Sequence, residues 1–183
     1  MKKIILIILL CVCLFAPIKT ISGRIYLGIE GGGAVPRGYL NNFFAEAFQG
    51  GLMIETTTEI RPFFIQFKCD HYVFSNTTSK MDLTPLILNI LIKTPWRYNL
   101  KPYFSAGGGI TFEKLQTEEA EIRNIDPVLS AGGGIEYMFQ TGSLILGPYM
   151  EGLYHFIYQK SQKAAMHNGE VMLLHLGMKF KIF

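Results

Sequence analysis

Hydrophobic and polar positions alternate with a period of two along most of the chain after residue 22, and no helical period of any length interrupts them. Polar clusters divide this pattern into eight segments. Most of the segments are longer than the usual strand of about five or six residues. A tilted strand needs about 9–11 residues to cross a bilayer. The predicted strands are residues 24–35, 48–57, 61–73, 81–93, 101–113, 126–139, 144–158 and 169–182.

The connections between these segments fall into two classes. Those after the second, fourth and sixth strands are tight, at residues 58–60, 94–100 and 140–143. Those after the first, third, fifth and seventh strands are longer or more polar, at residues 36–47, 75–80, 114–125 and 159–168. Alternating short turns and long loops are typical of outer-membrane barrels. We therefore predict an all-β fold, an eight-stranded antiparallel up-and-down transmembrane β-barrel with both termini in the periplasm.

The direction of the apolar face decides between a membrane barrel and a soluble one. In the sixth strand Leu129, Ile135 and Tyr137 share one face, and Ser130 and Glu136 share the other. Alternation alone also fits a secreted, lipocalin-like barrel with the apolar face inward. Aromatic residues near both strand ends favour two interfacial girdles in a membrane. They are Phe63, Phe64, Trp96, Tyr98, Tyr103, Tyr137, Phe139 and Phe180 near the turns, and Tyr72, Phe74, Phe112, Tyr154, Phe156 and Tyr158 near the loops.

Three glycine triplets, residues 31–33, 107–109 and 132–134, interrupt strand-like sequence. Glycine inside a strand marks a bend, a bulge or a close approach. We interpret the triplets as the means of curving a narrow barrel, not as a binding site. Folding the chain near residue 120 predicts that the second and third triplets lie beside each other on neighbouring strands.

Residues 1–22 have the pattern of a secretory signal peptide, and residues 23–183 form the predicted barrel. Lys2 and Lys3 precede an apolar run that is too short for a spanning helix. Removing this segment leaves Cys69 as the single cysteine and makes basic and acidic residues equal in number. A balanced chain offers no electrostatic support for nucleic-acid binding.

With apolar side chains outward, the charged residues of the strands must point into the lumen. An eight-stranded barrel is just wide enough for side chains to fill it, and buried charges have to be paired. We expect a polar network inside the barrel rather than an ion path. Its predicted members are Glu30, Glu55, Lys68, Asp70, Glu113, Glu136, Glu151, His155, Lys179 and Lys181, with His175 on the same face.

The segment from Thr84 to Lys93, a short turn and the segment Lys101-Pro-Tyr-Phe-Ser-Ala-Gly-Gly-Gly-Ile110 resemble the outer-membrane protein β-barrel domain family, which includes the small OmpA-, OmpX- and OmpW-like barrels. The C-terminus, alternating from Leu174 to Ile182 and ending in Phe183, is similar to the assembly signal of that family. The resemblance implies integral insertion in the outer membrane of a Gram-negative-type bacterium. It also implies contact with the assembly machinery, and an OmpW-like conduit for small hydrophobic molecules as one alternative.

Few residues suggest chemistry. His71 precedes Ser75 and Asn76, which loosely resembles lipid A-modifying outer-membrane enzymes, but the spacing and the lipid-facing phase of His71 argue against a catalytic pair. No metal or cofactor motif is present. We expect a monomeric, non-catalytic protein with a structural or surface-interaction role through its outer loops. Its partners would be outer-membrane lipid and lipopolysaccharide, with no nucleic acid.

Overall fold

The computed structural model describes residues 23–58, 60, 62–94, 99–118, 120–158 and 169–182. The predicted signal peptide, Trp96, Tyr98, the connection 159–168 and Phe183 lie outside the described residues. The elements are β1 (Ile25–Gly38), the 3-10 turn η1 (Tyr39–Asn42), β2 (Ala47–Thr57), β3 (Phe63–Ser75), β4 (Ser79–Lys93), β5 (Leu100–Thr117), β6 (Glu121–Tyr137), β7 (Phe139–Thr141), β8 (Leu144–Ile157) and β9 (Gly169–Lys181). No helix among these residues has the length and hydropathy needed to cross a membrane.

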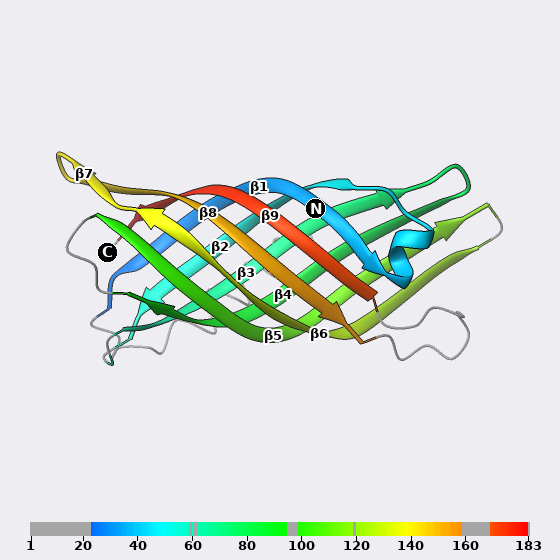
Figure 1. Cartoon of the computed structure of the whole chain (residues 1–183), viewed down its shortest axis with the longest axis horizontal. Helices are drawn as coiled ribbons and strands as arrows, with labels where there is room; N and C mark the ends of the chain where they lie inside the picture. Colours follow the sequence, from blue (N-terminus) through cyan, green and yellow to red (C-terminus); the bar gives the residue numbers. More distant parts are fainter. Residues whose placement is uncertain are drawn as a thin grey trace.

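All strand pairings are antiparallel, and the sheet closes on itself (Figure 1). Each long strand pairs with the next along the chain, β1 pairs with β9, and β6 pairs with β8 from Val128 to Glu136. The short β7 continues β6 after Met138 and extends the hairpin with β8. The predicted closed, eight-stranded antiparallel barrel is confirmed. We call the end with Ile25 and Lys181 the turn end, and the end with η1 the loop end (Figure 1).

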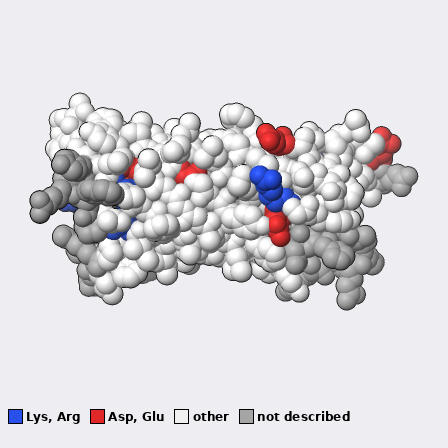
Figure 2. Space-filling model, in the orientation of Figure 1, with Lys and Arg blue, Asp and Glu red and all other residues white. Residues whose placement is uncertain are grey.

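The outer wall carries a continuous apolar belt. On β5 the outward residues run from Leu100 to Phe112 without a charge, and the first charged one is Lys114. At about 3.3 Å per residue and a strand tilt of about 40°, this stretch spans roughly 25–30 Å, the height of a bilayer core. Side chains such as Phe104 (74 % exposed) and Leu129 (64 %) project fully from the wall. Charged atoms are correspondingly sparse over the middle of the visible face (Figure 2).

The loops at two positions are shorter than the sequence predicts. Residues 114–125 were expected to form a loop, but β5 continues to Thr117 and β6 starts at Glu121. Similarly, Asn76 to Thr78 alone connect β3 to β4, where Asn76 Oδ1 accepts hydrogen bonds from the backbone of Thr78 and Ser79. The polar residues at these sites belong to strands that extend beyond the apolar belt, and their polarity does not mean that the strands end there.

The prediction that two glycine triplets lie side by side is also wrong. Ala106 pairs with Ala131, so Gly107 faces Ser130 and Gly109 faces Val128. With the short β5–β6 connection Gly108 pairs with Leu129, four residues from the Gly133 that the side-by-side arrangement requires. The triplets nevertheless share a property: a Cβ on any of their inward glycines would overlap a carbonyl oxygen of a neighbouring strand. These glycines are Gly32, Gly107, Gly109, Gly132 and Gly134.

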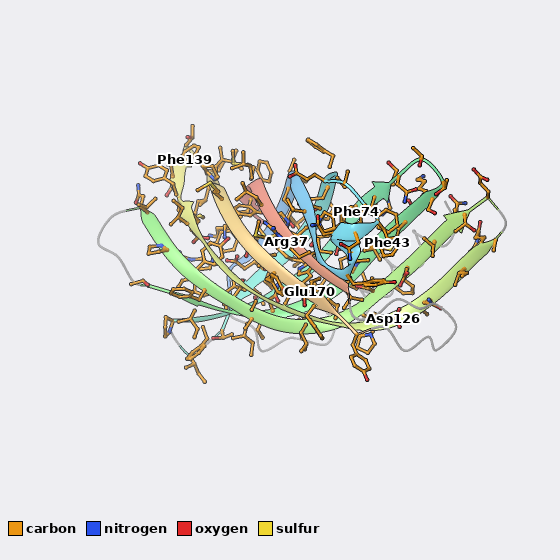
Figure 3. All side chains as sticks on the ribbon, turned by 45° about the vertical axis from the view of Figure 1, so that its right-hand side comes forward. Arg37, Phe43, Phe74, Asp126, Phe139 and Glu170 are labelled. Atoms are coloured by element: carbon orange, nitrogen blue, oxygen red, sulfur yellow. The ribbon has the colours of Figure 1, made fainter. Side chains whose placement is uncertain are left out.

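The loop end is covered from within by the segment that follows β1. Leu40 of η1 is completely buried, and Phe44 is almost so. The ring of Phe44 lies 6.2 Å from that of Phe74 on β3, and Asn76 Nδ2 donates a hydrogen bond of 2.9 Å to the carbonyl of Phe43. Figure 3 shows Phe43 and Phe74 at this end of the barrel. The first connection therefore folds into the mouth instead of extending away from it.

Candidate functional site

The barrel interior has two halves of opposite character. The half toward the loop end is an apolar core that fills the lumen between η1 and the middle of the strands. Its members are Ala34, Leu40, Phe44, Tyr72, Phe74, Met81, Leu83, Ile87, Leu115, Val128, Leu153, Ile157, Val171 and Leu173. The half toward the turn end is lined by charged and polar side chains. Tyr72, Phe74 and Tyr103, expected in the interfacial girdles, point into the lumen instead (0 %, 0 % and 3 % exposed).

The deeper of two ionic groups surrounds Lys68. We call it the Lys68 cluster, and it consists of Glu30, Lys68, Asp70, Glu151 and His175. Lys68 Nζ lies 3.0 Å from a carboxylate oxygen of Glu30 and contacts Glu151 directly. Around this cluster Tyr149 donates a hydrogen bond to Glu30, and Ser105 Oγ donates to Glu151 at 3.3 Å. With His175 Nδ1 3.4 Å from Glu30, these contacts join residues of five strands, β1, β3, β5, β8 and β9, and tie opposite walls of the barrel together.

The second ionic group lies closer to the turn end and has equal numbers of opposite charges. We call it the quartet: Glu55, Lys93, Glu136 and Lys179. Each lysine contacts both carboxylates, with Lys93 Nζ 2.8 Å from Glu136 and Lys179 Nζ 2.9 Å from Glu55. The Lys93 ammonium also lies 4.5 Å from the centre of the Phe64 ring, within the range of a cation–π interaction. Full pairing of four buried charges is what their desolvation cost demands.

The structure gives each residue of the predicted network a position. Glu30, Lys68, Asp70 and Glu151 fall in the Lys68 cluster, and Glu55, Glu136 and Lys179 in the quartet. Three residues lie elsewhere. A ring nitrogen of His155 lies 3.3 Å from the Tyr72 hydroxyl, and Glu113 is buried beside the apolar half. Lys181 is half-buried and joins neither ionic group.

Sequence reasoning overlooked Lys93, although this residue contacts both acids of the quartet. Lys93 is the last residue of β4 and adjoins a turn, so its polarity suggested a strand end. The alternation along β4 could have predicted its inward position, because Lys93 shares the inward phase of Asn89 and Leu91. Asn89 was overlooked in the same way; it donates to Gln66 at 3.3 Å on the neighbouring strand.

Known proteins resemble this chain in fold rather than in sequence. No family model and no curated protein matches the chain. Among solved structures, Neisserial surface protein A (NspA) matches with a TM-score of 0.62 and 15% sequence identity, over 86% of this chain and 97% of NspA. The Yersinia pestis attachment invasion locus protein, Ail, matches with a TM-score of 0.50 and 11% identity, over 87% of this chain and 97% of Ail. This is the fold of the small outer-membrane barrels.

In this outer-membrane barrel fold His71 and Ser75, which loosely resembled part of a lipid A-modifying enzyme, lie far apart. His71 lies on the outer face of β3, where its Nδ1 atom is 3.0 Å from Thr84 Oγ1 of β4. Ser75 lies four residues further along the same strand face, roughly 13 Å away at 3.3 Å per residue. The hydrogen-bond contact that a Ser–His nucleophile requires is therefore not formed by this pair.

Among the described residues one group has the composition of a metal site. Ligand atoms of Glu30, Glu151 and His175 lie within 4.8 Å of one another. The Lys68 ammonium already lies among them, 3.4 Å from His175 Nδ1. A metal ion would have to displace a completely buried lysine, so these residues act as partners of Lys68.

The quartet yields a direct prediction for Glu136, which contacts both lysines. Replacing Glu136→Gln leaves the quartet with one uncompensated buried positive charge. We expect the free energy of unfolding to fall by about 2–3 kcal/mol, the scale of a hydrogen bond to a charged group. Urea titration of the refolded protein, followed by the mobility difference between folded and heated protein on gels, measures this change. An unchanged midpoint would count against a stabilising network.

Proposed function

We propose that the chain is an integral outer-membrane protein of a Gram-negative-type bacterium, exported by residues 1–22 and inserted with its turn end in the periplasm. Its role is structural or surface-interactive, exerted through the loop end, and it performs no catalysis. The observation that carries the proposal is the inverted polarity of the barrel: an apolar belt outside and paired charges inside. A soluble barrel that binds apolar ligands would instead have an apolar interior and a polar outer wall.

The loop end supports a surface role because it carries most of the outward charge. Beyond the apolar belt, Glu121 bonds Arg123 and Gln116 on the β5–β6 hairpin. These hydrogen bonds, that of Arg123 foremost, lower the pKa of Glu121 to about 2. On the neighbouring part of the wall, formed by β8, β9 and β1, Tyr154 donates to Glu170, which is paired in register with Arg37 (Figure 3). The similarity in fold to NspA, named a surface protein, and to Ail, named an attachment invasion locus protein, points the same way.

The alternative of a conduit for small hydrophobic molecules receives less support from the interior. Its apolar half is packed with side chains and stops at the Lys68 cluster, which carries several charges. An apolar solute would meet those charges before it reached the turn end. We also propose that the barrel is monomeric and that its belt contacts membrane lipid and lipopolysaccharide, with insertion by the assembly machinery.

Cell fractionation tests this proposal. Expressed with residues 1–22 in a Gram-negative host, the protein should sediment with outer membranes and remain there after carbonate extraction. We expect this result because the apolar belt is too large to remain exposed to water and is buried only when the barrel is in a membrane. A variant with Leu129→Arg and Leu176→Arg, two of the most exposed belt residues, should fail to accumulate there. Recovery of the unmodified protein in the soluble periplasmic fraction would refute membrane insertion.

A further inference from the structure

The turn end contains a cavity of about 810 Å³ that no part of the proposed function uses. Its floor is formed by the quartet. Its walls come from the strand ends that meet at the turn end, namely the starts of β1, β3 and β5 and the ends of β2, β4, β6 and β9. The lining residues include Arg24, Lys101, Tyr26, Phe63, Phe64 and Met138. Sites of about 300–1,000 Å³ are typical of pockets for small organic molecules.

The charges that line this cavity do not balance. Among the described residues that line it, four are positive and two are negative: Arg24, Lys93, Lys101 and Lys179 against Glu55 and Glu136. Both carboxylates are already engaged by Lys93 and Lys179. No ion pair joins Arg24 or Lys101 to an acid, so within the described residues the two rim charges have no carboxylate partner, and the side chain of Arg24 bonds the neutral Tyr26 side chain.

The walls between the rim and the floor are largely apolar and aromatic. Phe63 and Phe64 start β3, Tyr26 lies near the start of β1, and Met138 follows β6. A ligand complementary to this cavity has an apolar or aromatic body and carries negative charge at the end that faces the rim. The floor is closed to it, because the quartet is internally neutral and the Lys68 cluster lies behind.

We propose that the turn-end cavity is a binding site for a small organic anion with an aromatic or aliphatic body, held by Arg24 and Lys101 at the rim and by the aromatic walls. Because the lumen beyond the quartet is filled, the site is blind: the anion enters and leaves from the same side. Binding requires no catalysis and no passage through the barrel.

A polysulfonated aromatic dye tests the site. A fluorescent naphthalenedisulfonate with both sulfonates on one ring carries its charge at one end, is too polar to enter detergent micelles, and reports binding to the refolded full-length mature protein through its fluorescence anisotropy. We expect saturable binding that weakens as salt is added. Arg24→Gln and Lys101→Gln should each weaken it about threefold, and the double variant about tenfold, since each removes one partly screened charge interaction. Thr94→Trp, which fills the cavity without a charge change, should also weaken it.

The matched control is Arg123→Gln, which removes the same charge at the loop end, where the side chain is 72% exposed. It should leave dye affinity unchanged, and folded gel mobility should be normal in every variant. Equal affinity in the double variant and the parent protein would overturn the proposal. So would binding of an acidic peptide without any binding of the dye, because that result would indicate a macromolecular partner.

Discussion

Replacing Lys68→Met is expected to destabilise the barrel by about 3–5 kcal/mol, the cost of leaving buried charges without their partner. Lys68 is completely buried and contacts Glu30 and Glu151, neither of which can reach water. Methionine retains much of the packing volume, so the loss reports the charge. Urea titration in detergent or lipid vesicles, with folded gel mobility as the readout, measures the change.

Two further variants separate charge from packing in this experiment. Lys80→Met removes a lysine whose side chain is 51% exposed and 3.6 Å from Asp82; such a surface pair contributes about 0–1 kcal/mol. Adding Glu30→Gln and Glu151→Gln to Lys68→Met should recover part of the stability, because the uncompensated carboxylates are then gone. If the triple variant were no more stable than Lys68→Met, the loss would come from packing and the charge argument would fail.

Replacing Gly32→Ala is expected to destabilise the barrel by about 1–3 kcal/mol or more, as overpacking does in a closed structure. The added Cβ would overlap the carbonyl oxygen of Leu174 on β9, and backbone atoms of His175 lie just behind. Backbone cannot turn away as a flexible side chain would, so β1 and β9 must separate where they close the barrel. Refolding yield and the urea midpoint measure the effect.

The adjacent residue provides the control. A Cβ at Gly33 would meet no atom within 4 Å, because this position faces outward. Gly33→Ala should therefore leave stability within about 0.5 kcal/mol of the parent, as for ordinary surface substitutions. Equal losses for the two neighbouring alanines would mean that strand propensity, rather than close approach of β9, determines the need for glycine here.

The sequence was sufficient for the barrel because alternation repeats in every long strand and gives the same inward phase throughout. That phase placed Lys68 and Glu136 correctly on the inner face, but it could not pair them. Which carboxylate meets which lysine depends on the register between strands, and that register depends on connection length. Between β5 and β6 the short turn places Gly108 opposite Leu129, four residues from the expected Gly133.

The division of the interior into an apolar and a polar half was not predicted either, because position near a strand end was weighed above phase. Tyr72 and Phe74 sit near a strand end, where aromatic residues often anchor a barrel at the membrane surface. They share the inward phase of Lys68 and Asp70 and lie inside, where the ring of Phe74 contacts Phe44 from the segment after β1 and the ring of Tyr72 contacts Phe74. That segment folds inward through long-range contacts, and local pattern carries no information about such contacts.

The β5–β6 hairpin has a consequence for how the loop end is recognised. Its strands remain paired up to Gln116 and Glu121, and Arg123 bonds Glu121, so this segment is a hydrogen-bonded hairpin rather than an irregular loop. A binding partner pays little entropy to order it. Antibodies raised against the folded protein would thus read a conformational epitope across two strands, which a linear peptide of the same residues does not reproduce.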